Sequence, residues 1–175
     1  MSRVFFISDP HFGHKNLQDL RGKPSEEIDD LIITNWNKTV SKRDTVYLLG
    51  DITMEKPKLI QYYLSQLSGD IRVVGGNHDL KNTSLVLQEM GIPIMGCLEY
   101  KGFICTHIPI HPSELHGYYR GNIHGHIHNL SIDLGSEYFN VTCEHINYIP
   151  IEFTTILKIH ADRKIKDYIK TIPLE

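Results

Sequence analysis

The chain has 175 residues, 41% hydrophobic and 22% charged, a composition that excludes a disordered chain and fits a single domain over 1–175. Its formal net charge of −3 argues against an extended nucleic-acid-binding surface. The apolar runs have only strand length, so no membrane-spanning segment is expected. Three cysteines without paired spacing and the lack of an apolar leader predict a cytoplasmic protein with free thiols.

The first half of the chain alternates between short apolar runs and amphipathic segments. Three apolar runs have the length of buried strands, at 3–8, 45–49 and 71–74. Three segments carry apolar residues at helical spacing, at 25–40, 57–67 and 83–90. This alternation of strands and helices predicts an α/β protein.

The second half is predicted to form a second sheet of short strands. Residues 99–106 indicate a hairpin that turns at Lys101-Gly102, and further strands are expected at 122–128 and 138–143. Short strands with local turns favour a second sheet that is more antiparallel than the first. From Glu152 onward we expect a short helix and a closing strand.

Polar residues that bind metals or carry protons follow the predicted strands. Histidine is abundant, with 11 residues, six of them between His107 and His128. The candidates are Asp9 and His11, Asp51, Asn77 with His78 and Asp79, His107, and His126 with His128. Because ligands of α/β folds bind at the carboxyl ends of strands, we expect these side chains to form one site.

The mixture of oxygen and nitrogen donors suits manganese, iron, zinc or nickel better than calcium or magnesium alone. The number of donors fits two ions, and Asp51 is the candidate bridge because it lies between the other clusters in the chain. Two divalent ions, two carboxylates and a hydroxide would leave a net charge of about +1. A phosphate oxygen is a natural ligand for that charge.

Five motifs in this order resemble the blocks of the calcineurin-like metallophosphoesterases, most closely the compact uncapped bacterial and phage-encoded members. They are Asp9-x-His11, Gly50-Asp51, Gly76-Asn77-His78-Asp79, His107 and Gly125-His126-x-His128. The resemblance implies a four-layer α/β/β/α sandwich with two mixed β-sheets. It also implies two divalent ions, manganese first, with iron, zinc, nickel or cobalt as alternatives. The implied ligands are Asp9, His11 and His128 for one ion, Asn77, His107 and His126 for the other, and Asp51 for both.

The implied reaction is hydrolysis of a phosphate ester, with a phosphodiester favoured, by in-line attack of a hydroxide shared by the two metals. In this scheme His78 is not a ligand but stabilises charge and protonates the leaving oxygen, while Asp79 orients its ring. A phosphorylated small molecule or a nucleotide-derived compound is the expected substrate. His14, Arg21 and Arg120 are candidate substrate contacts, Arg120 from a loop over 107–120 that is expected to rim the site.

Several alternatives stay open at this point. The same residues would serve a phosphomonoesterase or a nucleotide pyrophosphatase. A non-catalytic, protein-binding scaffold of the same fold would bind little metal and hydrolyse nothing. Arg21 could instead be a solvated charge, which is the commoner fate of an arginine, and His145 and His160 are expected at the surface.

Overall fold

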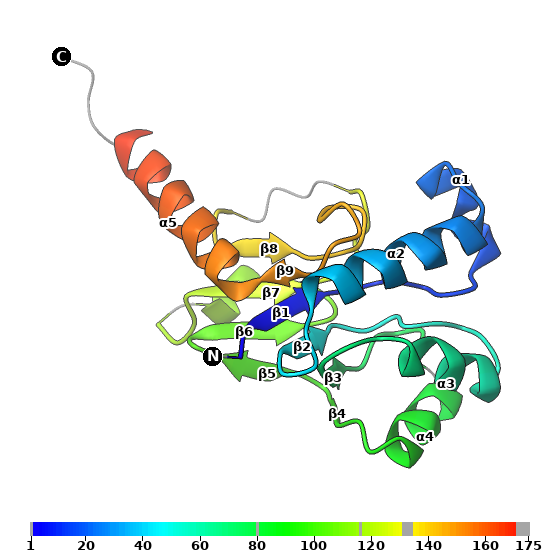
Figure 1. The fold of residues 1–175 in the computed structure, drawn as a ribbon. Coiled ribbons are helices and arrows are strands. Elements are labelled where there is room, and N and C mark those ends of the chain that lie inside the picture. Colours follow the sequence, from blue (N-terminus) through cyan, green and yellow to red (C-terminus); the bar gives the residue numbers. More distant parts are fainter. Residues whose placement is uncertain (1, 80, 116, 131–134, 171–175) are drawn as a thin grey trace.

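The computed structural model describes residues 2–79, 81–115, 117–130 and 135–170. Two β-sheets form the centre of the molecule (Figure 1). The first sheet has the strand order β4-β3-β2-β1-β9, in which β1 to β4 are parallel and β9 is antiparallel to β1. Its strands are β1 (Val4–Ile7), β2 (Thr45–Leu48), β3 (Asp70–Val74), β4 (Ile94–Met95) and β9 (Ile151–Glu152).

The second sheet has the order β5-β6-β7-β8. Its strands are β5 (Leu98–Tyr100), β6 (Phe103–Thr106), β7 (Gly121–His124) and β8 (Tyr138–Asn140). The hairpin of β5 and β6 is confirmed, and both Lys101 and Gly102 have the positive φ that its tight turn requires. β6, β7 and β8 run parallel, so the second sheet is mixed, with one antiparallel pair among its three. Each connection between these strands leads from the carboxyl end of one strand to the amino end of the next, whereas a hairpin would join two neighbouring ends.

The three helices predicted in the first half are confirmed as α2 (Ser25–Thr39), α3 (Pro57–Ser65) and α4 (Lys81–Glu89). Shorter helical turns are η1 (Lys15–Leu17), α1 (Gln18–Arg21) and η2 (Pro112–Leu115). The last helix, α5 (Phe153–Lys170), is longer than expected, and the closing strand β9 precedes it. The protein is therefore an α/β fold with two mixed sheets flanked by helices, as predicted.

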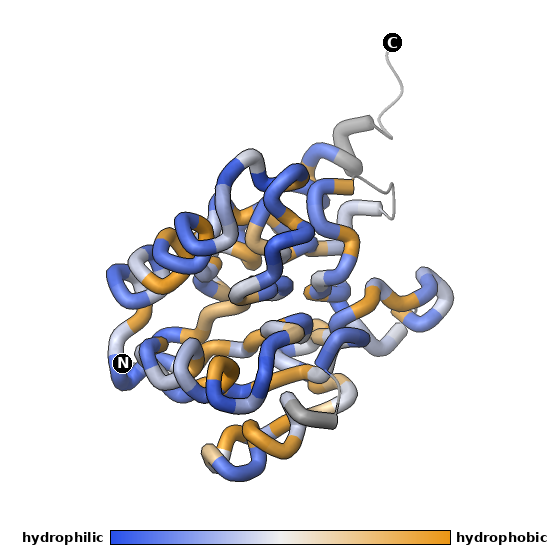
Figure 2. Tube along the Cα trace, turned by 90° about the vertical axis from the view of Figure 1, so that its right-hand side faces the viewer, coloured by the Kyte–Doolittle hydropathy of each residue, from blue (hydrophilic) through white to orange (hydrophobic). Residues whose placement is uncertain are grey.

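The core lies on both faces of the first sheet, because successive side chains of a strand point to opposite faces. Phe5 and Ile7 of β1 belong to the cluster that packs against α2, α3 and α4. Phe6 belongs to a second cluster, shared with β6, β7 and the first turn of α5. Figure 2 shows the helices alternating between polar and apolar residues along the chain, as amphipathic helices do. This packing fixes the strand ends that carry the candidate site.

The surface shows one departure from expectation. His145 is exposed as predicted, but His160 is only 3% exposed, because α5 turns it toward the rings of Phe103 and Phe139.

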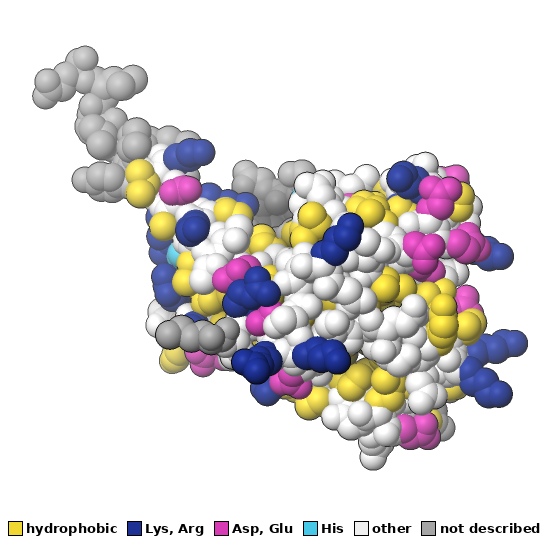
Figure 3. All heavy atoms as spheres, viewed as in Figure 1, with side chains coloured by type: hydrophobic (Ala, Val, Ile, Leu, Met, Phe, Trp, Pro, Cys, Tyr) yellow, Lys and Arg dark blue, Asp and Glu magenta, His cyan; other side chains and the backbone are white. Residues whose placement is uncertain are grey.

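Basic and acidic side chains are interspersed on the face shown in Figure 3. All three cysteines are free thiols. Within the described residues, no helix combines the length and hydropathy needed to cross a membrane.

Asp44 ties the start of β1 to the start of β2. Its carboxylate accepts hydrogen bonds from the Arg3 backbone at 2.8 Å, the Arg3 guanidinium at 2.8 Å and the Ser41 backbone at 2.9 Å. Burial opposes ionisation, but these bonds outweigh it and hold the pKa of Asp44 well below its ordinary value. Ionised Asp44 therefore stabilises the fold at neutral pH.

Asp44→Asn should lower the free energy of unfolding by about 2 kcal/mol at pH 7, because charge-assisted hydrogen bonds are lost. A group whose pKa is depressed in the folded state loses its stabilising effect as the pH falls. The difference in unfolding free energy between Asp44→Asn and the unmodified protein should therefore shrink below about pH 4. Urea unfolding over a pH series measures both effects. Asp70→Asn, at an exposed ion pair with Arg72, is the control and should change stability by less than about 1 kcal/mol. If the free energy of unfolding of Asp44→Asn stays lower by the same amount at every pH, this role of the Asp44 charge is contradicted.

Candidate metal centre

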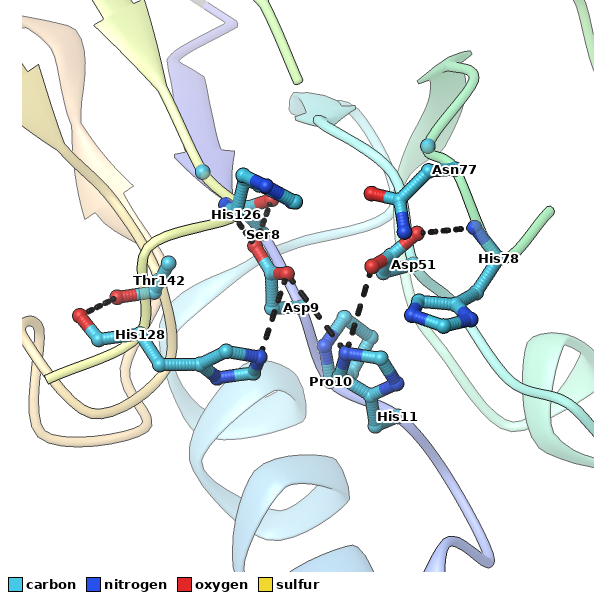
Figure 4. Close-up of polar contacts among 12 residues, drawn as sticks. Ser8, Asp9, Pro10, His11, Asp51, Asn77, His78, His126, His128 and Thr142 are labelled. Atoms are coloured by element: carbon cyan, nitrogen blue, oxygen red, sulfur yellow. Dashed lines mark hydrogen bonds and ion pairs between the residues drawn. The ribbon is translucent and has the colours of Figure 1, made fainter. Parts of the chain in front are cut away.

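The predicted ligands meet at the carboxyl ends of the strands of both sheets (Figure 4). Two sets of three residues each bring one donor atom to within 4.8 Å of the others. The first group is Asp9, His11 and His128, and the second group is Asp51, His107 and His126. Asn77 joins the second group, because its Oδ1 lies 2.9 Å from Nε2 of His107. All seven predicted ligands are therefore brought together.

Asp9 has one anchored oxygen and one open oxygen. Its Oδ2 accepts hydrogen bonds from the Ser8 hydroxyl at 2.5 Å and from the His126 backbone N–H at 2.8 Å. Its Oδ1 lies 3.7 Å from Nε2 of His11 and 3.9 Å from Nε2 of His128. The anchored oxygen fixes the carboxylate, and the open oxygen faces the two imidazoles.

Asp51 follows the same pattern but faces both groups. Its Oδ1 accepts the backbone N–H of His78 at 2.8 Å. Its Oδ2 lies 3.5 Å from Nε2 of His11 in the first group and 3.4 Å from Nε2 of His107 in the second. Nδ1 of His107 lies 2.7 Å from the carbonyl oxygen of Leu49, which directs Nε2 of the ring toward the site. A single carboxylate oxygen thus lies between the two groups.

Buried atoms without partners test whether the residues fit a metal. Six buried side-chain atoms of the described residues have no hydrogen-bond partner, and three of them are Oδ1 of Asp9 and both ring nitrogens of His11. An unsatisfied buried polar group costs about 1–3 kcal/mol. A divalent cation between Oδ1 of Asp9 and Nε2 of His11 would give both of these atoms a partner, and mixed imidazole and carboxylate donors suit such an ion. The residues therefore fit a metal at this site.

The ligand loops have an unusual backbone. Asp9, His11, Asp51, His126 and His128 all have positive φ, between 47° and 73°, which is uncommon outside glycine. Such strain gathers where the surrounding structure holds a functional geometry. His126 and His128 accordingly lie in a loop after β7, and the expectation that this strand extends to His128 is wrong.

Gly125 lets this loop approach β1. A Cβ at this position would collide with the Ser8 hydroxyl and with Oδ2 of Asp9. The glycine therefore allows the His126 N–H to reach Asp9.

Glu144 is a site residue that no sequence motif marks. Its Oε2 lies 3.3 Å from Nδ1 of His128, and its Oε1 accepts a hydrogen bond from Nε of Arg21 at 2.8 Å. Burial disfavours the charge, but His128 and Arg21 lower the pKa of Glu144 to about 2. The hydrogen bond that Glu144 accepts from Nδ1 of His128 in turn raises the pKa of His128. Glu144 thereby orients Nε2 of His128 toward Asp9.

Arg21 binds Glu144 and the backbone of the loop that carries Asp9 and His11, and it does not face the space between the ligands. Its guanidinium also donates to the carbonyl oxygens of Asp9 and Pro10, both at 2.8 Å, and its side chain is only 3% exposed. The prediction that Arg21 binds a phosphate oxygen is wrong, because these contacts use the guanidinium inside the fold.

Glu144→Gln should weaken binding of one ion by about 10–100-fold and leave the other ion unchanged. The reason is that His128, which belongs to the first group, is the candidate ligand that Glu144 contacts among the described residues. Competition with a chromophoric chelator measures the two affinities separately. His145→Gln, at the exposed neighbouring position, is the control. Equal weakening of both ions would contradict this assignment.

Two other predicted residues have different roles. The carboxylate of Asp79 accepts the backbone N–H groups of Gly76 and Asp51 at 2.8 Å and of Ile52 at 3.0 Å. It therefore holds the loop that carries Asp51, and the prediction that it orients the His78 ring is wrong. Arg120 precedes β7, whereas His126 follows it, so Arg120 lies at the opposite end of the strand. The predicted substrate contact of Arg120 is wrong, because the 107–120 connection must return to the start of a parallel strand.

His14 and His78 remain beside the centre. The ring centroid of each lies 5.6 Å from that of His11, and both residues are partly exposed. Burial and the neighbouring His11 lower the pKa of His14, which favours its neutral form. Both imidazoles can reach a molecule bound at the two groups, and their contact with substrate remains a prediction.

No family model matches the chain. The uncharacterized protein MJ1445 of Methanocaldococcus jannaschii is 32% identical over 181 residues, which cover 94% of this chain and 95% of MJ1445. The chain belongs to the same family as MJ1445. The Gene 66 protein of Mycobacterium phage L5 is 39% identical over 84 residues, 45% of this chain and 41% of that protein.

A crystal structure with the same fold is that of AQ665 from Aquifex aeolicus, a protein of unknown function. It matches with a TM-score of 0.72 and 28% identity, over 91% of this chain and all of AQ665. The nuclease MPE of Pseudomonas putida gives a TM-score of 0.49 and 17% identity over 72% of this chain and 61% of that one, too low to carry an argument. MJ1445 and AQ665 have no described activity, so a function must be argued from the site.

Proposed function

We propose that the chain is a metal-dependent phosphoesterase that hydrolyses a phosphate ester, with a phosphodiester favoured. The observation that carries the proposal is the position of Oδ2 of Asp51, 3.5 Å from His11 and 3.4 Å from His107. Asp9, His11 and His128 would hold one ion, and Asn77, His107 and His126 the other. Asp51 would serve both. Manganese is the first candidate, and the donors also permit iron, zinc, nickel or cobalt.

The charge of the site supports a phosphate ligand. When bound, two divalent ions supply Lewis acidity and a water of lowered pKa. Asp9 and Asp51 are the only carboxylates in the two groups, and neutral imidazoles and the Asn77 amide add no charge. The carboxylates therefore cancel only half of the charge of two divalent ions. The remaining positive charge would bind and polarise a phosphate group.

His78 is the candidate proton donor. Its backbone N–H is fixed on Asp51, while its ring lies beside His11 and is partly exposed (Figure 4). An imidazole in this place would stabilise charge on the phosphate and donate a proton to the leaving oxygen. A proton donor helps most when the leaving oxygen is strongly basic, as an alkoxide is.

Other functions of the same site make different predictions. A phosphomonoesterase or a nucleotide pyrophosphatase would use the same residues and differ in substrate. A protein-binding scaffold needs no metal ligands, and the unpartnered buried atoms of Asp9 and His11 argue against it. We propose a phosphorylated small molecule or a nucleotide-derived compound as substrate, and a cytoplasmic location.

The proposal is tested by hydrolysis of bis-p-nitrophenyl phosphate and p-nitrophenyl phosphate. The protein is stripped with a chelator and refilled with manganese. We expect turnover that requires manganese and is faster with the diester. Faster turnover of the monoester would favour the phosphomonoesterase. Absence of both bound metal and turnover would favour the scaffold.

A further inference from the structure

A cavity of about 360 Å³ lies beside the second group of ligands, where β3, β4 and β6 end. Its volume falls within the range of small-molecule pockets, about 300–1,000 Å³. It is lined by Gly75, Gly76, Asn77, Gly96, Thr106, His107 and Ile108. Because Asn77 and His107 are candidate metal ligands, a phosphate held at the centre would lie next to this cavity.

One wall of the cavity is largely bare backbone. The Gly75 N–H donates to the carbonyl oxygen of Met95 at 2.8 Å, which joins the ends of β3 and β4. A Cβ at Gly76 would collide with Asp51, so this position cannot carry a side chain. At Gly96, by contrast, a Cβ would have no heavy atom within 4 Å. The space in front of Gly96 is therefore open and belongs to the cavity.

The described side chains that line the cavity carry no formal charge, since none of them is Asp, Glu, Lys or Arg. The Thr106 hydroxyl is already used, because it donates to the carbonyl oxygen of Ile108 at 2.7 Å and accepts from Nδ2 of Asn122 at 3.0 Å. Ile108 offers a large apolar side chain that is 51% exposed. A second phosphate or a carboxylate would find no counter-charge here, whereas a flat apolar group would cover the peptide planes and Ile108.

We propose that this cavity binds an uncharged, planar substituent of the phosphate ester, an aromatic ring or a nucleobase. The inference rests on the proposed function, because it requires the phosphate to be held at the metal centre. It narrows the substrate class to esters that carry such a group.

Two phosphonates that cannot be hydrolysed as esters test the proposal by calorimetry on manganese-loaded protein. Phenylphosphonate should bind at least about tenfold more tightly than methylphosphonate, because its ring is buried in the cavity. Gly96→Leu should fill the cavity and reduce this ratio to about one, with the Kd of methylphosphonate unchanged. The substitution is compatible with the fold, since Gly96 does not have positive φ and its Cβ meets no neighbour.

Gln61→Leu is the matched control, because it adds a leucine on the exposed side of α3 and should preserve the tenfold ratio. Equal affinities of the two phosphonates for the unmodified protein would overturn the cavity proposal. A ratio that survives in Gly96→Leu would overturn it as well. If neither phosphonate binds the manganese-loaded protein, the proposed phosphate site itself is wrong, and the cavity proposal, which depends on it, is wrong as well.

Discussion

Asp51→Asn should weaken the binding of both metal ions and reduce turnover by at least about 10³-fold. The variant keeps an oxygen that can accept the His78 N–H, but it loses the charge that faces His11 and His107. Asp9, the other carboxylate of the two groups, forms its ion pairs with His11 and His128 of the first group. Metal titration of the stripped variant, followed by the hydrolysis assay, measures both losses.

The control for this variant is Asp70→Asn, the same chemical change at an exposed ion pair on the first sheet, which should bind two ions normally. Loss of only one ion in Asp51→Asn would show that the carboxylate belongs to a single group. Normal binding of both ions would remove Asp51 from the centre.

His78→Ala should retain both ions and lose about 10²–10⁴-fold in turnover. The reason for this separation is that His78 anchors Asp51 through its backbone N–H, which alanine also provides. The imidazole alone is removed. The loss should grow as the leaving group becomes poorer, because a better leaving group needs less help from a proton donor. Rates with a series of substituted phenyl esters measure this dependence.

His111→Ala, at an exposed position in the 107–120 connection, should match the unmodified protein. Loss of metal in His78→Ala would make His78 a ligand. A loss of turnover that is equal for all leaving groups would leave charge stabilisation but exclude proton donation.

The strands and helices around the first sheet were predictable because their signals are local. The runs that became β1, β2 and β3 are short and apolar, and α2 carries apolar residues at helical spacing. The direction of β7 and β8 depends on how long connections return the chain, and no local pattern encodes this. The length of α5 was missed because its apolar spacing marks only the start of the helix: Phe153 and Ile156 are buried in the second cluster, whereas Ile165 is 57% exposed.

The candidate ligands were predictable because each follows a strand end, and strand ends of an α/β fold converge. The roles of residues whose contacts depend on the fold could not be predicted from the sequence. Arg21 reaches under the site to Glu144, which is 123 residues away in the chain. Asp79 is adjacent to His78 in sequence, yet its carboxylate turns to backbone N–H groups. Neighbouring positions in a motif therefore did not imply contact between side chains.

The most direct test of the central claim is the electron paramagnetic resonance spectrum of the protein loaded with two equivalents of manganese(II). If Asp51 serves both ions, they would lie close enough to be magnetically coupled, so we expect the broad spectrum of a coupled pair. Asp51→Asn should abolish it. A spectrum of isolated ions, or saturation at one ion per chain, would contradict a centre in which the two groups share one carboxylate.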